Sequence, residues 1–271
     1  MIIDKPTSTE PLRQLWKQAF GDTDAFIDSF FRVGYSQNHC RQITENGKVV
    51  SALYWFDSKF DNKKIAYLYG IATHKEYRNR GLCRLLLEDT HRHLKDLGYE
   101  GTLLVPSNSQ LFSFYEKFGY RTCSSVNEFT AKADMSVLLN PMMADPILSQ
   151  EDIAYNNTCF IRPLTSRSYV EKRQDYMPAG SVEPDETLMA FANENYSFYT
   201  GNDFVMCASA EGATLFVPEF LGNIAAAPGI VAALGKKKGR FRTFGEKKPF
   251  AMYRPLTHHI EKPTFFALAL D

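Results

Sequence analysis

The chain has 271 residues, with 31 basic and 31 acidic side chains and 44% apolar residues. This balance is typical of a folded globular protein, and the zero net charge argues against a general attraction to nucleic acid or to an anionic membrane surface. No segment has the roughly 18 to 20 consecutive apolar residues that span a bilayer, and the N-terminus lacks the pattern of a signal peptide, so we expect a cytoplasmic protein of two domains.

The first 133 residues predict alternating helices and strands. Helices are expected over 10–20, capped by Ser8 or Thr9, and over 23–33, capped by Asp22. The turn sequences Asn46-Gly47 and Asp61-Asn62 predict three neighbouring antiparallel strands within 40–73. Apolar residues with a period of 3.6, from Cys83 to Leu97, predict a helix that ends at Gly98. A strand over 101–107, a helix over 108–118 and a strand over 120–132 complete this half.

The second half predicts a similar order of elements. Residues 134–150 carry proline and turn signals and are expected to be a connection. Further elements are two helices over 165–174 and 184–195, a hairpin over 203–220 that turns at Glu211-Gly212, an alanine-rich segment over 223–237 in the place of a third helix, and strands over 239–244, 249–254 and 263–270. The order suggests a duplicated fold.

Cysteine and histidine spacing predicts no metal centre. The five cysteines are scattered and form no CxxC pair, so we expect reduced, mostly buried thiols rather than a zinc site or a disulfide framework. His258 and His259 are adjacent, and neighbouring residues on a strand point in opposite directions, with no third ligand evident.

The loop with the sequence RNRGLC, residues 78–83, turns from a strand into a helix. The first turn of a helix leaves about four amide N–H groups without intrahelical partners, at the positive end of the helix dipole. With Arg78 and Arg80 these groups form a site suited to a diphosphate, because Gly81 lets the phosphates approach the backbone. Arg84 adds charge one turn later. The alternative is a solvated helix end that binds nothing.

Two segments of the first half resemble signatures of the GNAT superfamily of N-acetyltransferases. Arg78-x-x-Gly81-x-Cys83 resembles the Q/R-x-x-G-x-G/A motif of that superfamily, with Cys83 in place of the usual glycine or alanine and Lys75 in place of a common proline. The segment NSQLFSFYEKFGY resembles the second signature, represented here by Asn108, Tyr115, Gly119 and Tyr120. The resemblance covers roughly residues 1–133.

This resemblance implies a fold class and a domain division. The class is α/β (α+β), with a mixed, mostly antiparallel central sheet flanked by helices, the GNAT fold, duplicated with a degenerate second copy. The implied domains are a catalytic, acetyl-CoA-binding domain over 1–133, a linker over 134–150 and a degenerate GNAT-like domain over 151–271.

The resemblance also implies site residues. Main-chain groups of Ile71 and Thr73 would bind the thioester and the pantetheine arm, Asn108 would contact that arm, and Tyr115 would protonate the leaving thiolate. The pyrophosphate of acetyl-CoA would lie on Arg78, Asn79, Arg80, Gly81, Leu82 and Cys83. Without the resemblance, Asn108 is a candidate helix N-cap and Tyr115 a candidate core residue.

The implied function is transfer of an acetyl group from acetyl-CoA to a primary amine of a small molecule or a peptide, by direct attack in a ternary complex and without a metal. The alternative is a sensor or scaffold module that binds an acyl-CoA without turnover. His74, or a water held by Tyr67 and Tyr69, is a candidate base, and the carboxylate of Asp271 is a candidate for entering the active site. The wall of the acceptor pocket is expected among Phe26, Phe30, Phe31 and Trp55, although core packing is the alternative for each.

Overall fold

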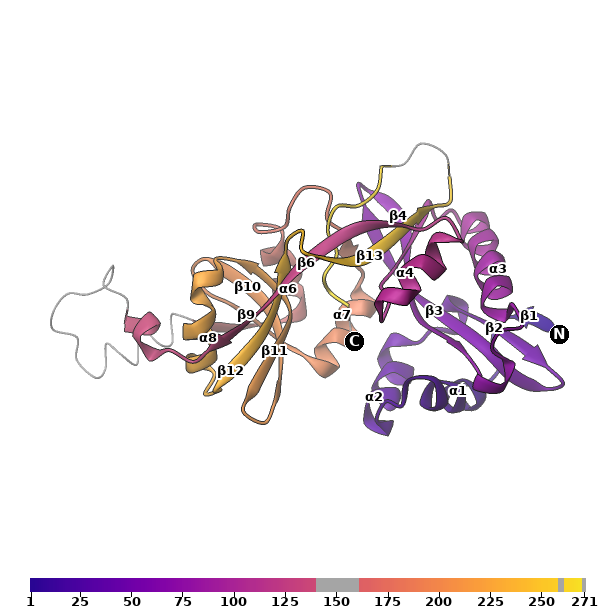
Figure 1. Ribbon diagram of the computed structural model, residues 1–271, viewed down its shortest axis with the longest axis horizontal. Coiled ribbons are helices and arrows are strands. Elements are labelled where there is room, and N and C mark those ends of the chain that lie inside the picture. Colours follow the sequence, from indigo (N-terminus) through magenta and orange to yellow (C-terminus); the bar gives the residue numbers. More distant parts are fainter. Residues whose placement is uncertain (140–160, 258–260, 270–271) are drawn as a thin grey trace. The chain divides into compact units, whose positions relative to one another are not determined.

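The computed structural model describes residues 1–139, 161–257 and 261–269, and Figure 1 shows its helices and strands. The chain divides into two compact units. Unit 1 comprises Met1–Cys123, Gly180–Glu194 and Ala251–Thr264, and unit 2 comprises Ser124–Ala179, Asn195–Phe250 and Phe265–Asp271. Each unit is therefore built from three stretches that are separate in the sequence.

Unit 1 is an open sheet with helices on both faces. Its strands are β1 (Ile2–Asp4), β2 (Cys40–Glu45), β3 (Lys48–Phe60), β4 (Lys63–Thr73), β5 (Gly101–Leu104), β8 (Glu183–Pro184) and the part of β13 (Lys248–Pro255) that follows Phe250. Its helices are α1 (Glu10–Phe20), α2 (Asp24–Ser29), the π-helix η1 (Phe30–Gly34), the 3₁₀-helices η2 (Gln37–His39) and η3 (Lys75–Tyr77), α3 (Leu82–Asp96), α4 (Ser109–Glu116) and α7 (Glu186–Asn195).

The sheet of unit 1 has the order β1-β2-β3-β4-β5-β13, and β8 pairs with β3. All of the pairs are antiparallel except β4 with β5, which are parallel and are joined by α3. The three neighbouring antiparallel strands predicted within 40–73 are β2, β3 and β4. The predicted class, a mixed and mostly antiparallel sheet flanked by helices, is confirmed.

Alternating side chains of β3 divide the core of unit 1 into two layers. Tyr54 contacts α1 through Trp16, with ring centroids 5.4 Å apart, and Phe56 contacts α7 through Phe191. Trp55 points the other way, into the apolar cluster that contains Leu86 and the rest of the buried face of α3. Figure 1 shows α1 and α3 on opposite sides of the sheet. Core packing of Trp55, the alternative to a place in the acceptor-pocket wall, is confirmed.

Two details of the predicted helices are also wrong. The N-cap of α2 is Thr23, whose hydroxyl accepts a hydrogen bond from the Phe26 N–H at 3.2 Å, and Asp22 accepts instead from the indole N–H of Trp16 at 2.8 Å. Leu97 is 52% exposed because α3 ends one residue before it.

Unit 2 is a second sheet with its own helices. Its strands are β6 (Arg121–Lys132), which begins in unit 1, β7 (Arg162–Leu164), β9 (Ser197–Thr200), β10 (Phe204–Glu211), β11 (Thr214–Gly222) and β12 (Lys238–Phe244). Its helices are η4 (Met135–Leu139), α6 (Ser166–Arg173), η6 (Ile224–Ala226) and α8 (Ala227–Ala233). The strand order is β6-β12-β11-β10-β9-β7, and only β11 and β12 are parallel.

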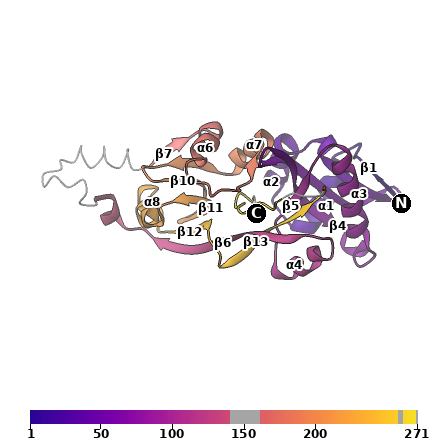
Figure 2. The ribbon, with the colours of Figure 1, turned by 90° about the horizontal axis from the view of Figure 1, so that it is seen from above.

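Helices α6 and α8 lie on opposite faces of this second sheet (Figure 2). Tyr169 of α6 packs on Phe198 of β9, with ring centroids 4.6 Å apart, whereas Ile230 of α8 belongs to an apolar cluster with Met206 and Phe241. The succession of hairpin, helix and parallel strand occurs in both units, as β3-β4-α3-β5 and as β10-β11-α8-β12. This succession supports a duplication, which stays a prediction.

The strand predicted over 263–270 is wrong for the part that can be described. Phe265 to Ala269 are buried, but they form no ladder beyond a single bridge at Phe265. The adjacent pair His258-His259 and the residue Asp271 lie outside the described residues. No helix within the described ranges has both the length and the apolar character that crossing a membrane requires.

Candidate active site

The start of α3 has no side-chain cap. Gly81 is the N-cap, with a left-handed φ of +76°, and it supplies no side-chain cap to the helix. The first amide that bonds within the helix is that of Leu85, to the Gly81 carbonyl at 3.1 Å, so the N–H groups of Leu82, Cys83 and Arg84 lack a backbone acceptor among the described residues. A Cβ at position 81 would meet no atom within 4 Å, so the space in front of this turn is clear.

The three arginines of this corner have different partners. Arg80 pairs with Glu45 at 2.9 Å, and Arg84 pairs with Glu88 at 3.0 Å. Arg78 donates through Nε to the Thr73 carbonyl at 3.2 Å and pairs with no carboxylate in the described ranges. Arg78 is therefore the guanidinium of this loop whose charge is not neutralised by a neighbouring side chain.

The strands beside α3 separate after a short parallel pairing. Only Ile65, Ala66 and Tyr67 of β4 pair with β5, opposite Gly101, Thr102 and Leu103. The part of β4 that follows, which includes Ile71 and Thr73, has no ladder partner on that edge within the described chain. Thr73 is held by its side chain, whose hydroxyl lies 2.9 Å from that of Ser51, and by the Arg78 contact.

A bulge in β4 was not predicted. Gly70 has a φ of +58°, and the pairing of β3 with β4 shifts between Ala52 and Tyr54. A Cβ at Gly70 would lie 2.9 Å from ring atoms of both Trp16 and Tyr54. A glycine inside a strand pattern is the sequence signal for such a bulge, and it redirects the backbone next to Ile71.

Helix α4 is capped by Asn108 and brings Tyr115 to the start of α3. The Asn108 side chain accepts hydrogen bonds from the N–H groups of Gln110 at 3.1 Å and Leu111 at 3.2 Å, so its interpretation as an N-cap is confirmed. Tyr115 packs in the same apolar cluster as Cys83, and the Arg84 guanidinium lies 5.9 Å from the centre of the Phe118 ring at the end of α4.

Tyr115 is buried and protonated. The residue is 7% exposed, and its hydroxyl makes no hydrogen bond within the described part of the chain. Burial, and secondarily the nearby Cys83 thiol, raises the pKa of Tyr115 well above its usual range. The hydroxyl therefore keeps its proton at neutral pH. The core interpretation of this tyrosine is confirmed, and its role as an acid stays a prediction.

A buried chain of hydrogen bonds that includes Tyr120 was not predicted from the sequence. The Arg254 guanidinium donates to Nδ1 of His91 at 2.6 Å, which leaves Nε2 of His91 to donate to the Tyr120 hydroxyl at 2.8 Å. Tyr120 lies 2.9 Å from the Thr102 hydroxyl. The Tyr120 N–H donates to the Tyr115 carbonyl at 3.3 Å, so this chain fixes the turn that follows Tyr115. No sequence signal links residues so far apart.

Both ring nitrogens of His74 lie close to hydrogen-bonding groups, and its role as a base stays a prediction. One ring nitrogen lies 3.0 Å from the Gln18 amide nitrogen, and the other accepts from the Glu76 N–H at 3.4 Å, at the start of η3. Tyr67 and Tyr69 both pack against the Phe56 ring. No group of three or more metal-ligating side chains gathers in the described residues.

The first part of the chain matches a known family model. Residues 5–123 match the model of the acetyltransferase (GNAT) domain. No curated protein sequence matches the chain significantly.

Solved structures share the fold over nearly the whole chain. A GCN5-related N-acetyltransferase from Kribbella flavida aligns with a TM-score of 0.65 and 14% identity, over 94% of this chain and 72% of that one. One from Anabaena variabilis gives a TM-score of 0.63 and 14% identity, over 94% and 73%. Eis1 from Mycobacterium abscessus gives 0.60 and 12%, over 94% and 74%. Identities this low establish the fold alone.

Proposed function

We propose that this chain, whose residues 5–123 form a GNAT acetyltransferase domain, transfers an acetyl group from acetyl-CoA to a primary amine of a small molecule or a peptide. The observation that carries the proposal is the uncapped start of α3, with clear space in front of Gly81, beside a buried and protonated Tyr115.

The coenzyme's pyrophosphate fits the start of α3. Its oxygens would accept from the free N–H groups of Leu82, Cys83 and Arg84, and the Arg78 guanidinium would neutralise part of the charge. Arg80 and Arg84 can join, because their present ion pairs are on the surface, with the arginine side chains 49% and 64% exposed, and such pairs contribute at most about 1 kcal/mol. Asn79, with a φ of +62°, and Gly81 shape the loop around the phosphates.

The thioester would lie along the unpaired edge of β4. Main-chain groups of Ile71 and Thr73 would hydrogen-bond the acetyl-pantetheine arm, and the free amide nitrogen of Asn108 would contact it from α4. Backbone donors near the carbonyl suit this reaction, because negative charge develops on that oxygen during attack.

The chemical step is a direct displacement in a ternary complex. The neutral amine nitrogen attacks the thioester carbon, the bond from carbon to sulfur breaks, and the departing thiolate takes the proton of the Tyr115 hydroxyl. The amine loses its own proton to solvent or to a base. Because the pKa of Tyr115 is raised by burial, the hydroxyl enters the step protonated.

Replacing Tyr115 by phenylalanine distinguishes an enzyme from a module that binds acetyl-CoA without turnover. We expect Tyr115→Phe to lower kcat by about 10²- to 10⁴-fold, the usual range for a lost general acid, while the Kd for coenzyme A changes less than about twofold. Tyr176→Phe, at an exposed hydroxyl in unit 2, is the matched control. Release of coenzyme A is best followed by chromatography, because the chain carries 5 cysteines that react with thiol reagents.

The acceptor panel comprises aminoglycosides, polyamines, amino acids and peptides. Calorimetry with Arg78→Gln runs in parallel, and we expect its Kd for coenzyme A to rise about tenfold, whereas the Kd of the control Arg92→Gln, on α3, should stay unchanged. If coenzyme A binds in a way that depends on Arg78, but no acceptor causes release of coenzyme A from acetyl-CoA, the result would favour the sensor or scaffold module over the enzyme. Full activity of Tyr115→Phe would exclude this tyrosine as the acid.

A further inference from the structure

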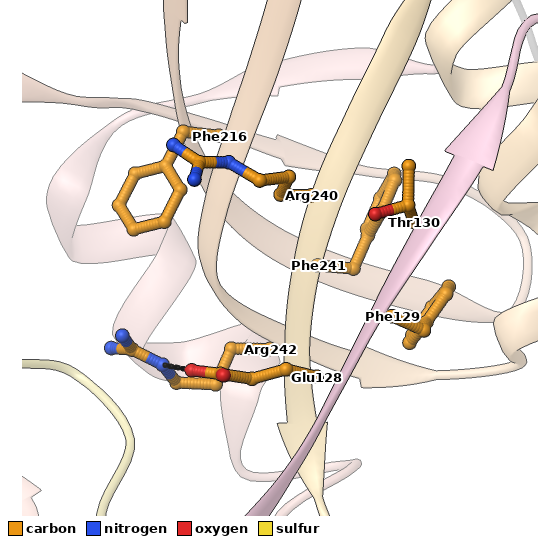
Figure 3. Close-up of a pocket in the computed structure, with 7 residues that line it drawn as sticks. All are labelled: Glu128, Phe129, Thr130, Phe216, Arg240, Phe241 and Arg242. Atoms are coloured by element: carbon orange, nitrogen blue, oxygen red, sulfur yellow. Dashed lines mark ion pairs between the residues drawn. The ribbon is translucent and has the colours of Figure 1, made fainter.

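A cavity of about 290 Å³ lies on the sheet of unit 2, over β6, β11 and β12 (Figure 3). Glu128, Phe216, Arg240 and Arg242 extend to one side of β12. Phe129 and Phe241 extend to the other side, where they stack and pack toward the apolar cluster of α8. The cavity is therefore separate from the α8 core, and its charged lining comes from one face of the sheet. We refer to it as the Arg240 pocket.

Arg240 supplies a guanidinium without a carboxylate partner. The residue is exposed, and its guanidinium carbon lies 5.6 Å from the centre of the Phe216 ring. It forms no ion pair with any carboxylate of the described ranges. The single carboxylate that lines the pocket, that of Glu128, lies 3.5 Å from Nε of Arg242 and 2.7 Å from Nζ of Lys248. Arg242 and Lys248 thus share the negative charge of Glu128, and Arg240 does not pair with it.

Two further lysines extend the positive charge along the same face. Lys238 precedes Arg240 by two residues on β12, so the two side chains share a face, and Lys132 lies directly opposite Lys238 on β6. Neither lysine has an ion-pair partner in the part of the chain that is described. Like charges directly opposite each other destabilise a strand pair, so this arrangement costs folding free energy unless an anion is present.

We propose that the Arg240 pocket binds a small organic oxyanion, a phosphate monoester or a carboxylate, that carries an aromatic ring. The planar guanidinium presents parallel N–H donors that match either oxyanion, and the half-buried Phe216 ring offers an apolar surface for the ligand's ring. The volume suits a molecule with one ring, at the lower end of small-molecule sites. All of the lining residues belong to unit 2, so the proposal is independent of the acetyl-transfer site.

Calorimetry on the full chain, with three probes, tests this proposal. Phenyl phosphate, inorganic phosphate and benzoate separate the contributions of the oxyanion and the ring. We expect phenyl phosphate to bind more tightly than inorganic phosphate, and benzoate shows whether a carboxylate is accepted. Arg240→Gln should weaken phenyl phosphate about tenfold or more, whereas Arg167→Gln, an exposed arginine that pairs with Glu171 on α6, should leave it unchanged.

Two additional variants distinguish a specific pocket from a surface that attracts anions only through its positive charge. Glu128→Gln removes the negative charge from the pocket wall and should tighten phenyl phosphate severalfold. Phe216→Ala should reduce the affinity for phenyl phosphate to that for inorganic phosphate. Equal losses in Arg240→Gln and Arg167→Gln would identify unspecific attraction and overturn the proposal. Absence of binding of every probe at 10 mM, an affinity of about 3 kcal/mol, would also overturn it. So would binding that stays unchanged in both Arg240→Gln and Phe216→Ala, and loss of that binding in Arg78→Gln would then place the probe at the start of α3.

Discussion

The buried Tyr120 hydroxyl is the centre of a sharp stability prediction. Tyr120 is completely buried, and its hydroxyl accepts from His91 and lies within hydrogen-bond distance of Thr102. Tyr120→Phe removes one oxygen atom and keeps the ring. The buried Nε2–H of His91 then loses its partner, and the buried Thr102 hydroxyl keeps only its longer bond to the Arg254 carbonyl, at 3.5 Å.

The expected cost follows from these two groups. A buried polar group without its hydrogen bond costs about 1–3 kcal/mol, so Tyr120→Phe should lower the free energy of unfolding by about 2–5 kcal/mol. Tyr253 provides the matched control, since its hydroxyl is buried and has no hydrogen-bond partner in the described ranges. Tyr253→Phe makes the same chemical change and should be neutral or stabilising, because no bond is lost and a desolvated hydroxyl is removed.

Urea unfolding followed by tryptophan fluorescence measures both variants. The chain has 2 tryptophans, Trp16 and Trp55, and both belong to unit 1, which also contains Tyr120 and Tyr253. The midpoint should fall in Tyr120→Phe at an unchanged slope, and it should stay or rise in Tyr253→Phe. Equal shifts in the two variants would refute the reasoning, because they would show that the hydroxyl contributes the same whether or not it is bonded.

Two further predictions concern unit 1. Gly70→Ala should lower the free energy of unfolding by about 2–4 kcal/mol, because the φ of Gly70 is +58° and a Cβ there would lie 2.9 Å from two aromatic rings. The control is Gly47→Ala, at a φ of +76° with open space around the position. It should lower the free energy of unfolding by about 1 kcal/mol in the same urea assay. Burial, and secondarily Arg254, lowers the pKa of His91 from 6.5 to about 3, so the unfolded chain binds the proton first on acidification. The free energy of unfolding of the unsubstituted protein, compared with that of His91→Gln, should therefore fall by about 1.4 kcal/mol per pH unit below pH 6.5 and should not differ in its pH dependence above it. The same pH dependence in the two proteins over the whole range would contradict this assignment. Burial raises the pKa of Asp185 to about 6 and acts in the opposite direction in both proteins, so the difference between them isolates the histidine.

Elements with local signals were predicted well. The helix expected over 10–20 is α1, and the turns at Asn46-Gly47 and Asp61-Asn62 join β2 to β3 and β3 to β4. Positive φ angles at all four turn residues explain why these sequences are so informative. The start of α3 was also predictable, because a strand, a glycine and the first turn of a helix are consecutive in the sequence. The family match over residues 5–123 confirms the resemblance that this loop suggested.

Features that depend on distant residues were not predictable. The hydrogen-bond chain that joins His91, Thr102 and Tyr120 includes Arg254, and no periodicity relates these positions. The face on which Trp55 lies depends on which helix covers each side of β3, and α1 and α3 are distant from β3 in the sequence. The apolar run over 263–270 was expected to be a strand because burial and apolar composition do not distinguish a ladder from a buried extended segment.

The place of β13 has a consequence for synthesis on the ribosome. Leu104 of β5 pairs with Met252, so the free side of β5 has no strand to cover it until the nascent chain has grown by some 150 residues. At about 5–20 residues per second this delay is roughly 7 to 30 s, which is long compared with hairpin formation in microseconds. An apolar strand edge exposed for that time is prone to aggregate, so we expect the emerging polypeptide to depend on chaperones more than a protein whose corresponding unit is contiguous in the sequence would.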